Sequence, residues 1–423
     1  MKQYDSYKDS GVQWIGEIPS HWKIVRGKYS TEVVPGFPFN SDQFTYEEND
    51  QYMPLIRIRD IANENTEVQY KGTYPQEAVV KNGDILVGMD GDFNISRWRG
   101  GNALLNQRVC KLLGTKLLDL NYVYYMLHFP LKCINDVTYS TTVKHLSTND
   151  ILNSYLPIPP LSEQKTIASY LDMKCSEIDK AIATQQKRIE LLQELRQNII
   201  THAVTRGINP DAPLKDSGVE WIGRIPSHWD MRKLKYNFYI YAGATPNTGN
   251  DKYWDGNIIW ITPADYKTDD KYVSEGQRTI TEEGYNSCNT QLVPKGSLIF
   301  SKRAPIGTVA ISNVDLCTNQ GCLSCVAKDV NTLFFYYLAS VYTDIFDLLG
   351  SGATFKEISA DTFANIKLPL PPLCEQQAIV THIEAETAKL DKQVAKANRQ
   401  ISLLQELKQS IITEVVTGKR KVC

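Results

Sequence analysis

An internal repeat constrains the fold of this chain more than any other feature of its sequence. Residues 8–22 read KDSGVQWIGEIPSHW, and residues 215–229 read KDSGVEWIGRIPSHW. Thirteen of the fifteen positions agree across a separation of 207 residues. A period of this length is far longer than that of a solenoid repeat. The sequence therefore predicts two copies of one large folding unit.

Two later phrases also return, and they extend the repeat over most of the chain. LPIPPLSEQKTIASYLD (156–172) returns as LPLPPLCEQQAIVTHIE (368–384), and LLQELRQNIITHAVT (191–205) returns as LLQELKQSIITEVVT (403–417). Both pairs are offset by 212 residues, so the second copy has gained five residues before this point. The pattern predicts a tandem duplication of a domain followed by a helix.

The interiors of the two copies have drifted apart. Between residues 23–139 and residues 230–351 only scattered matches survive. These are Gly83–Leu86 with Gly296–Ile299, Asn106-Gln107 with Asn319-Gln320, and Tyr124-Tyr125 with Tyr336-Tyr337. A shared frame around different interiors is the pattern expected of one scaffold that reads two different things.

The segments after the proline-rich phrases are predicted to be long helices. The first follows Pro160, where Ser162 and Glu163 supply an N-cap and an acidic first turn, and it meets no Pro or Gly before Val204. Its apolar stripe repeats every 3.5 residues on average, which is the spacing of a coiled-coil seam. The seam comprises Leu171, Ile178, Ile182, Ile189, Leu192 and Ile199, and in the second copy Ile383, Leu390, Val394, Ile401, Leu404 and Ile411.

A helix of about 43 residues is about 65 Å long, more than a small domain can cover. One alternative is that each helix packs on its own domain. The length and the duplication favour pairing of the two helices with each other.

The remaining segments predict mixed α/β domains. Short β-rich runs bounded by Gly, Pro, Asn and Asp occur at 52–58, 84–87, 258–262, 297–300 and 308–312, whereas 119–129 and 331–346 look helical. The predicted organisation is a first globular domain (1–158), a long helix (159–206), a linker with a second globular domain (207–370), and a second long helix with a tail (371–423).

Composition excludes several classes of protein. The 46 basic residues are balanced by 48 acidic ones, so the chain is not a polycation that coats nucleic acid, and any basic patch must be local. We find no apolar run of membrane-spanning length and no secretory signal at the polar N-terminus, so we expect no membrane partner. Nine irregularly spaced cysteines argue against a disulfide framework and for the reducing cytoplasm.

Signatures of catalysis are missing from the sequence. It contains no phosphate-binding loop, no zinc-protease or paired-CxxC metal site, and no G-x-S-x-G nucleophile. Cys322 and Cys325 form a lone CxxC within a β-rich run, for which buried thiols are the favoured interpretation. The two Pro-Pro pairs lack the acid or amide and the aromatic residue of a DNA methyltransferase motif. We therefore expect a protein that recognises a ligand but has no catalytic, metal or cofactor site of its own.

Polar and cationic side chains within the divergent interiors, together with two equivalent lysines just after them, are the candidates for DNA contact. Arg and Lys anchor phosphates, Arg also reads guanine, and Asn or Gln suit adenine. For each cation alone, the alternative is an ordinary solvated surface charge. The set comprises Arg57, Arg59, Arg97, Arg99, Gln107, Lys144, Lys302, Arg303, Gln320 and Lys356, and the 57/59 pair is predicted to share one face of a strand.

The three repeated phrases resemble the signature segments of specificity subunits of type I restriction–modification systems, and the resemblance spans the whole chain. It implies two target recognition domains that each read half of a bipartite, asymmetric double-stranded DNA site. The two helices would form an antiparallel coiled coil that sets the gap between the half-sites.

The resemblance also implies partners that carry the chemistry. Two methyltransferase subunits would bring S-adenosylmethionine, and restriction–translocase subunits would bring ATP and Mg²⁺, so the chain itself would bind no cofactor. In this setting, the repeated tryptophans serve either to dock two identical partners or to pack the scaffold. They are Trp14, Trp22, Trp221 and Trp229.

Two alternatives stay open. The chain could be a protein-interaction scaffold whose domains bind protein, which would show no preference for any DNA sequence at any salt concentration. It could also serve a methylation-only complex or another phage-defence complex, which the neighbouring genes would reveal.

Overall fold

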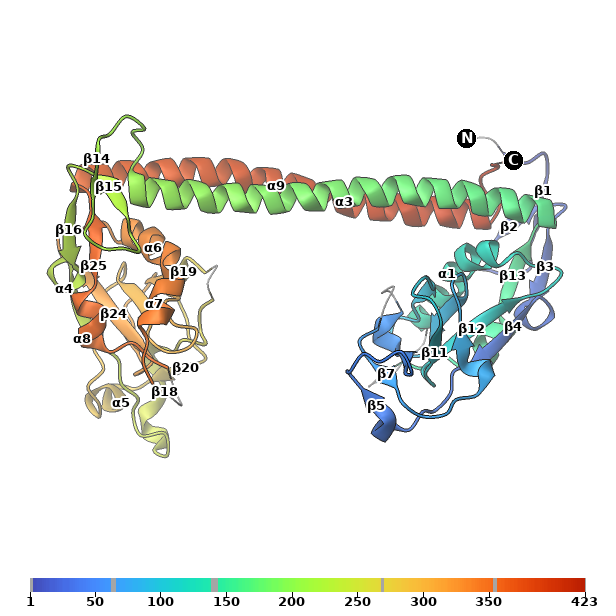
Figure 1. The fold of residues 1–423 in the computed structure, drawn as a ribbon, viewed down its shortest axis with the longest axis horizontal. Coiled ribbons are helices and arrows are strands. Elements are labelled where there is room, and N and C mark those ends of the chain that lie inside the picture. Colours follow the sequence, from blue (N-terminus) through green and yellow to red (C-terminus); the bar gives the residue numbers. More distant parts are fainter. Residues whose placement is uncertain (1–2, 62–65, 138–143, 268–269, 353–355, 423) are drawn as a thin grey trace. The chain divides into compact units, whose positions relative to one another are not determined.

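A computed structural model describes residues 3–61, 66–137, 144–267, 270–352 and 356–422. The chain forms two compact units. Unit 1 comprises Met1–Gln186 and Asn398–Cys423, and unit 2 comprises Lys187–Ala397. Each unit contains one globular domain and a portion of both long helices, which are α3 (Leu161–Arg206) and α9 (Leu373–Val416) (Figure 1).

The two long helices pair in antiparallel fashion within each unit. In unit 1, Leu171 of α3 shares a buried cluster with Ile411 of α9, and Asp179 lies 2.7 Å from Lys408. In unit 2, Val204 of α3 shares a cluster with Ile383 of α9. Early residues of one helix thus meet late residues of the other, which confirms the predicted pairing.

The burial of the predicted seam varies along its length. The globular domains pack on the seam around Leu171, Ile178 and Ile411 in unit 1 and around Ile383 in unit 2. Leu171, Ile178, Ile383, Leu390 and Ile411 are buried, whereas Ile182, Ile189, Leu192, Ile199, Val394, Ile401 and Leu404 are half-buried.

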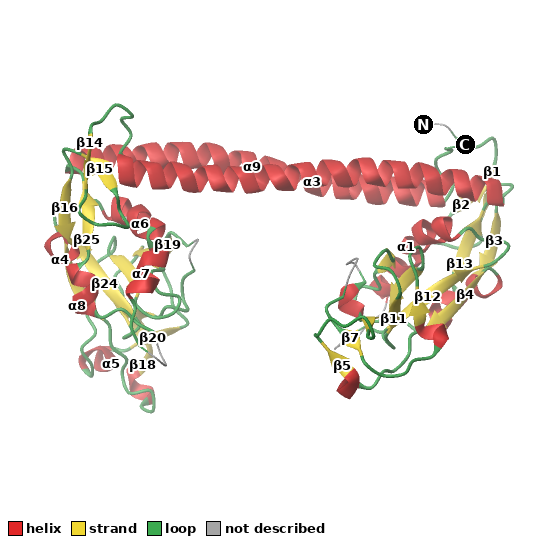
Figure 2. Ribbon diagram, viewed as in Figure 1, coloured by secondary structure: helices red, strands yellow, loops and turns green. Residues whose placement is uncertain are grey.

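The described part of unit 1 is a mixed α/β domain (Figure 2). A four-stranded antiparallel sheet packs beside a five-stranded sheet that includes the parallel pair β11–β6. The strand order in the four-stranded sheet is β10 (Ile95–Arg97), β9 (Ile85–Gly88), β12 (Val109–Gly114) and β4 (Thr31–Pro35). The strand order in the five-stranded sheet is β5 (Phe44–Thr45), β7 (Gln69–Tyr70), β6 (Met53–Ile56), β11 (Ala103–Leu105) and β8 (Val79–Val80). Two antiparallel strand pairs and two helices complete it: β1 (Tyr7–Asp9) with β2 (Glu17–Pro19), β3 (Lys23–Arg26) with β13 (Tyr155–Ile158), α1 (Leu120–Val137) and α2 (Thr148–Asn153).

Unit 2 repeats this plan with different numbers of strands and helices. Its main sheet runs β17 (Phe238–Ala242), β24 (Cys322–Ala327), β21 (Leu298–Ser301), β22 (Val309–Ser312) and β19 (Tyr272–Val273), and its smaller sheet runs β20 (Arg278–Ile280), β18 (Trp254–Ile261) and β23 (Cys317–Thr318). The remaining elements are β14 (Leu214–Asp216), β15 (Arg224–Pro226), β16 (Asp230–Lys233), β25 (Lys367–Leu370), α4 (Leu234–Asn237), α5 (Glu282–Asn286), α6 (Thr332–Val341), α7 (Thr343–Leu349) and α8 (Ala360–Asn365). The mixed α/β class and the repeated plan are as predicted.

The repeated phrases are close in space because they bind each other at the first turn of each long helix. In unit 1, Glu163 Oε1 accepts hydrogen bonds from the Tyr4 hydroxyl (2.6 Å) and from Trp22 Nε1 (3.1 Å). His21 Nε2 lies 2.8 Å from Glu163 Oε2. Burial raises the pKa of Glu163, but these hydrogen bonds outweigh it and lower the pKa below its ordinary value.

The next residue fastens the helix to the globular domain through backbone groups. Gln164 is 1% exposed, and its Oε1 accepts a hydrogen bond from the Asp119 N–H (2.9 Å). Its Nε2 donates to the carbonyl oxygens of Leu117 and Pro159, each at 2.9 Å. We call Glu163 and Gln164, with Glu375 and Gln376 in unit 2, the first-turn anchor.

Unit 2 forms the same anchor. His228 Nε2 lies 2.8 Å from Glu375 Oε2, and Gln376 accepts from the Asn331 N–H and donates to the Pro371 carbonyl. One difference is that Trp229 Nε1 finds no hydrogen-bond partner among the described residues.

The four repeated tryptophans belong to this frame. Trp22 and Trp229 are fully buried, which favours the packing interpretation over partner docking for these two. Trp14 and Trp221 are half-buried and their rings contact Phe129 and Tyr342, at centroid distances of 5.2 and 4.8 Å. Among the described residues, no helix combines the length and the apolar character needed to cross a membrane.

We predict that Gln164→Ala lowers the free energy of unfolding by about 3 kcal/mol, because three backbone groups lose their buried partner. Denaturant unfolding measures this change. Gln186→Ala, on an exposed position of the same helix, should stay within about 0.5 kcal/mol of the parent. Equal effects of the two substitutions would contradict the anchoring role of Gln164.

Candidate nucleic-acid interface

Four segments converge on one place in the first globular domain. The Asn106 N–H donates to the Ile56 carbonyl at the end of β6 (3.1 Å). The Met89 N–H, just after β9, donates to the Arg108 carbonyl (2.9 Å), and the Leu146 N–H donates to the Met89 carbonyl (2.7 Å). The strand ends of β6 and β9 thus meet the Asn106-Gln107 turn and the segment before α2.

The second globular domain makes the same convergence with its own residues. The Asn319 N–H donates to Ile261 at the end of β18, and the Lys302 N–H, after β21, donates to Gly321. The Ile358 N–H then donates to the Lys302 carbonyl. We call this place the strand-end site. It comprises residues 56–60, 88–90, 106–108 and 144–146 in the first domain, and 261–265, 301–303, 319–321 and 356–358 in the second.

A glycine supports the Asn-Gln turn in each domain. A Cβ atom on Gly36 would lie 2.0 Å from the Asn106 carbonyl oxygen, and one on Gly243 would lie 2.1 Å from that of Asn319. No side chain fits at such distances, so the backbone approaches the turn as only glycine allows. Both copies retain this close approach although the surrounding sequence has drifted.

The charges at the strand-end site are exchanged between the two domains. In the first domain the acid lies after the strand, where Asp90 forms a bridge with His145 (2.7 Å) and lies 3.5 Å from Arg108. In the second domain the base occupies this place, and Arg303 forms the equivalent bridge with Glu357 (2.8 Å). The hydrogen bond from Arg303 lowers the pKa of Glu357.

The turn after β6 in the first domain and the turn after β18 in the second have the same backbone hydrogen bond but different side chains. The Arg57 N–H donates to Asp60 Oδ2 (3.0 Å), and the Thr262 N–H donates to Asp265 Oδ2 (2.7 Å). Arg57 Nε also binds Asp60 Oδ2 at 3.0 Å, and this hydrogen bond raises the pKa of Arg57. The first domain therefore presents a guanidinium where the second presents a hydroxyl.

One predicted placement is wrong. Arg57 and Arg59 do not share a strand face, because β6 ends at Ile56 and residues 58–60 form the 3₁₀ turn η3 (Ile58–Asp60) that Asp60 caps. Arg57 is half-buried against Asp60. Arg59 is exposed and forms no hydrogen bond or ion pair with the residues that the structure describes.

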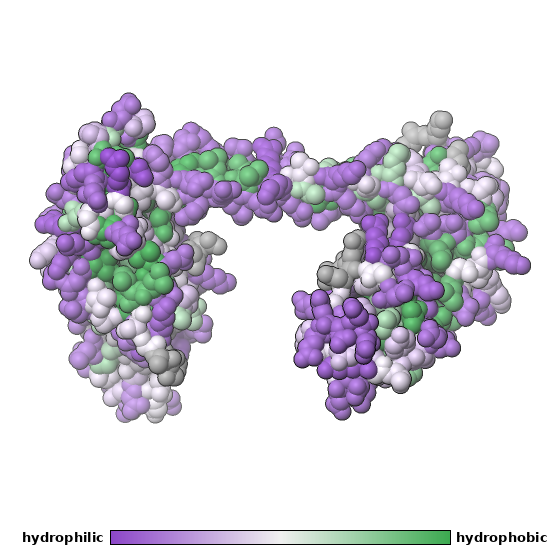
Figure 3. Space-filling model, viewed as in Figure 1, coloured by the Kyte–Doolittle hydropathy of each residue, from purple (hydrophilic) through white to green (hydrophobic). Residues whose placement is uncertain are grey.

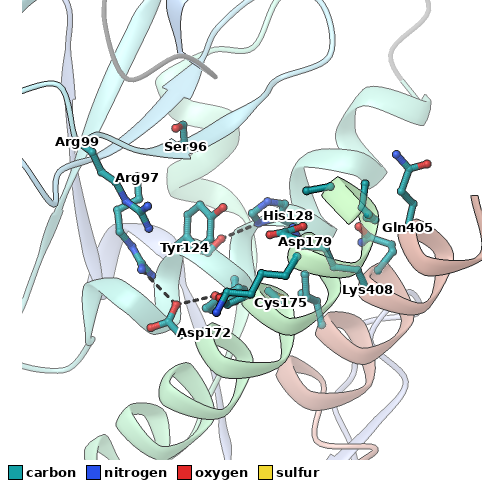
Figure 4. Close-up of a pocket in the computed structure, with 17 residues that line it drawn as sticks. Ser96, Arg97, Arg99, Tyr124, His128, Asp172, Cys175, Asp179, Gln405 and Lys408 are labelled. Carbon is teal, nitrogen blue, oxygen red and sulfur yellow. Dashed lines mark hydrogen bonds and ion pairs between the residues drawn. The ribbon is translucent and has the colours of Figure 1, made fainter. Parts of the chain in front are cut away.

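Arg97 and Arg99 lie outside the strand-end site. They line a cavity of about 1070 Å³ between the first globular domain and the unit 1 portions of α3 and α9 (Figure 4). Arg97 Nη1 lies 3.1 Å from Asp172 Oδ1 on α3. Arg99 is exposed at the rim of the same cavity.

The remaining candidates divide into anchored and exposed side chains. Lys144 Nζ donates to the Asn135 carbonyl (2.6 Å), Lys356 Nζ lies 2.7 Å from Asp347 Oδ2, and Lys302 Nζ lies 3.8 Å from Glu357. Gln107 and Gln320 are exposed at the tips of their turns, and Gln320 accepts a hydrogen bond from the Thr245 hydroxyl. The strand-end site of the first domain thus contains Arg57, Arg59, Gln107 and Lys144 of the predicted set. That of the second domain contains Lys302, Arg303, Gln320 and Lys356.

Sequence reasoning missed Asp90, Arg108 and His145. Their bridge joins segments 55 residues apart, and no local pattern signals such a contact. The one available signal was position, because Arg108 follows the matched Asn106-Gln107 pair.

The exposed groups of the site are suited to binding a nucleic acid. Exposed amides and cations can donate hydrogen bonds to base edges and phosphates. Among the described residues, no cluster of three His, Cys, Asp or Glu side chains is arranged to hold a metal ion. Cys322 and Cys325 are buried in β24, and burial raises the pKa of Cys322 to about 12, which disfavours a reactive thiolate.

We predict that Gly243→Ala destabilises the second domain by about 1–3 kcal/mol, because its methyl group would displace the Asn319-Gln320 turn. Gly249→Ala is the matched control, since its Cβ would meet only an ordinary contact at 3.5 Å. Thermal unfolding compares the two. An unchanged midpoint for Gly243→Ala would refute the close-approach argument.

Comparison with known proteins gives a family for this arrangement. The model of the type I restriction modification DNA specificity domain matches residues 22–194 and 226–400, one match per copy of the repeat. The type I restriction enzyme EcoBI specificity subunit of Escherichia coli is 29% identical over 427 residues, covering 97% of this chain and 89% of that one. The putative type I restriction enzyme MjaX specificity subunit of Methanocaldococcus jannaschii is 29% identical over 437 residues, covering 96% of each.

A solved structure shares the fold. It is a chain from the structure described as the basis of complex assembly and conformational transition of the type I R-M system. The TM-score is 0.72 at 16% identity, over 94% of this chain and 98% of that one. Since the family model covers most of the chain in two copies, this protein belongs to the family of type I restriction modification DNA specificity domains, as the repeated phrases predicted.

Proposed function

We propose that this chain is the sequence-reading subunit of a type I restriction–modification complex and that each globular domain reads one half of a bipartite DNA site. The observation that carries the proposal is the strand-end site. It has the same backbone in both domains, but Asp90 with His145 in one corresponds to Arg303 with Glu357 in the other. One frame with two different polar surfaces is suited to an asymmetric target.

The chemistry of the exposed groups supports DNA as the ligand. Gln107 and Gln320 are exposed on turns that supporting glycines hold in place, and an amide can bind an adenine edge through two hydrogen bonds. Arg59 and Arg108 are exposed beside the first of these turns and can contact phosphates or guanine. Because the net charge of the chain is only −2, binding would rely on such local groups.

In this proposal, residues 1–158 and 207–370 are the two target recognition domains. The helices within 159–206 and 371–423 set the gap between the half-sites. The chain needs no cofactor of its own, because S-adenosylmethionine, ATP and Mg²⁺ belong to the partners. It acts in the cytoplasm, in keeping with the free state of all eight described cysteines.

Two methyltransferase subunits are the partners best supported by the surface of the long helices. The phrase LLQEL occurs in both helices, and each copy exposes two leucines one turn apart. Leu191 and Leu195 are 53% and 46% exposed, and Leu403 and Leu407 are 52% and 48% exposed. Apolar side chains accordingly reach the surface of the helices (Figure 3). An apolar pair present twice suits one partner that binds in two copies, and the restriction–translocase subunits would join the resulting complex.

We predict that replacing residues 22–140 with the equivalent segment of another family member changes one half-site and leaves the other unchanged. Each wrong base pair costs about 1–3 kcal/mol, so altered reading is measurable. The measurement is a genome-wide map of methylated adenines in cells that express the chain and its methyltransferase partner. A parallel exchange within the second domain is the control and should change only the other half-site.

Two outcomes would contradict the proposal. If one exchange altered both half-sites, the domains would not read independently. If the complex with its methyltransferase bound all duplexes equally over a range of salt concentrations, the chain would be a scaffold rather than a reader.

We predict that Leu191→Ser with Leu195→Ser weakens the binding of one of the two methyltransferase subunits by about a hundredfold or more, because two apolar side chains no longer become buried. Mass photometry of the complex should then show one partner instead of two. Leu348→Ser, at a 75% exposed leucine of α7, is the control. Two bound partners in the double variant would place docking elsewhere.

A further inference from the structure

Each globular domain contacts its long helix a second time, beyond the first-turn anchor. In unit 1, Asp172 of α3 accepts hydrogen bonds from the Tyr125 hydroxyl of α1 (2.6 Å) and from Arg97 of β10 (3.1 Å) (Figure 4). The Arg97 guanidinium also lies over the Tyr124 ring, 4.9 Å from its centroid. We call this set of a cation, a tyrosine and a helix carboxylate the strut.

Unit 2 contains a strut at the equivalent place. Lys271 donates hydrogen bonds to the Tyr337 hydroxyl (3.1 Å) and to Glu384 of α9. Tyr337 and Glu384 are the repeat counterparts of Tyr125 and Asp172, each 212 residues further along. Although burial lowers the pKa of Lys271, its hydrogen bonds to Glu384 and Tyr337 raise it overall, so the lysine stays charged.

The cation of the strut comes from a different segment in the second copy. In the antiparallel pair of β10 and β9, Arg97 lies opposite Ile85. The equivalent pair in unit 2 is β22 and β21, in which Ile311 lies opposite Leu298. Ile311 therefore occupies the position that Arg97 has in unit 1. Ile311 is buried and apolar, but its N–H donates to the carbonyl of Lys271, just before β19. The segment that leads into β19 thus supplies the charge that the ladder position itself does not carry.

Both copies therefore pair a cation with the helix carboxylate, although the cation comes from different segments. A contact that only filled space would not need a charge, so we infer that the ion pair contributes to how the domain is held on its helix. Asp172 lies about 13 Å along the helix from the first-turn anchor, at 1.5 Å per residue. One attachment point allows a domain to tilt, whereas two points about 13 Å apart oppose tilting.

We propose that the strut fixes the angle of each recognition domain on its helix and thereby sets how strictly the complex measures the gap between half-sites. Arg97, Tyr125 and Asp172, with Lys271, Tyr337 and Glu384, are positioning residues rather than readers of bases. Arg97 was predicted to contact DNA, and in this proposal it positions the domain on the helix instead. The part concerning the gap rests on the proposed function, whereas the part concerning the angle does not.

The first experiment measures the angle without DNA. Spin labels carried by unnatural amino acids at Glu77 and Gln186, both exposed and both in unit 1, report the distance from the domain to the helix. In the full chain, Asp172→Ala should broaden the distance distribution. Asp179→Ala is the matched control, because Asp179 lies one heptad further along α3 and pairs with Lys408 of α9 instead. Its distribution should keep the width of the parent.

A milder variant guards against misfolding. Tyr125→Phe removes one hydroxyl and should broaden the distribution less than Asp172→Ala, with unchanged far-ultraviolet circular dichroism. An unaltered width in both strut variants would overturn the proposal.

The second experiment measures the gap in the complex with methyltransferase. Duplexes with the native gap and with a gap one base pair shorter or longer are compared for binding. The parent and Asp179→Ala should favour the native gap, and Asp172→Ala should lose about threefold to fivefold of this preference, a range set by the strength of a partly exposed ion pair. If the preference stayed intact despite a broadened distribution, the angle would not govern the gap. If the parent bound no sequence selectively, the proposed function would fail while the spin labels still decided the role of the strut.

Discussion

The hydrogen bonds of the first-turn anchor are the interactions on which the rest of this structure depends. A long two-helix coil presents a narrow surface, and a domain held to it by apolar contact alone could slide or rotate. Glu163 and Gln164 bind an indole, a hydroxyl and three backbone groups, each with a defined direction. Directional bonds in a buried setting fix where the domain attaches along the helix, because any misplacement leaves polar groups unsatisfied.

The anchor also accounts for which parts of the chain stayed alike after duplication. The phrases that contain His21-Trp22 and Glu163-Gln164 contact each other, so a change in one would require a change in the other. The strand-end sites depend mainly on backbone hydrogen bonds and on a close glycine, so their side chains were able to diverge. The division between repeated and variable sequence therefore follows the division between side-chain and backbone contacts.

Much of the fold could be predicted from the sequence, and the reasons are local. The 3.5-residue stripe and the absence of Pro and Gly predicted α3 to within a few residues of its observed bounds. Strands such as β9 and β21 were predicted because short apolar runs there lie between turn residues. The end of β6 was misplaced because Asp60 caps a turn from three residues away, and this local hydrogen bond outweighed the β-rich character of residues 52–58.

The site was harder to predict because its contacts join distant segments. Gln107 and Gln320 were found because both copies retain the same dipeptide. The bridge between Asp90 and His145 has no such signature, and neither has the contact of Arg97 with Asp172, 75 residues away. Two arginines two residues apart looked alike in the sequence, yet Arg97 contacts a helix carboxylate and Arg99 is exposed to solvent.

The exchanged charges of the strand-end site bear on how such a protein can change over time. Placing one member of the second pair into the first frame would set a glutamate at position 145 opposite Asp90, or an arginine at position 90 opposite His145. Either step taken alone would place like charges opposite each other in a partly exposed pair, at a cost of up to about 1 kcal/mol. Exchange of a whole segment that contains both members of the pair avoids this cost. A domain of this kind should therefore tolerate the replacement of such blocks better than single substitutions at these positions.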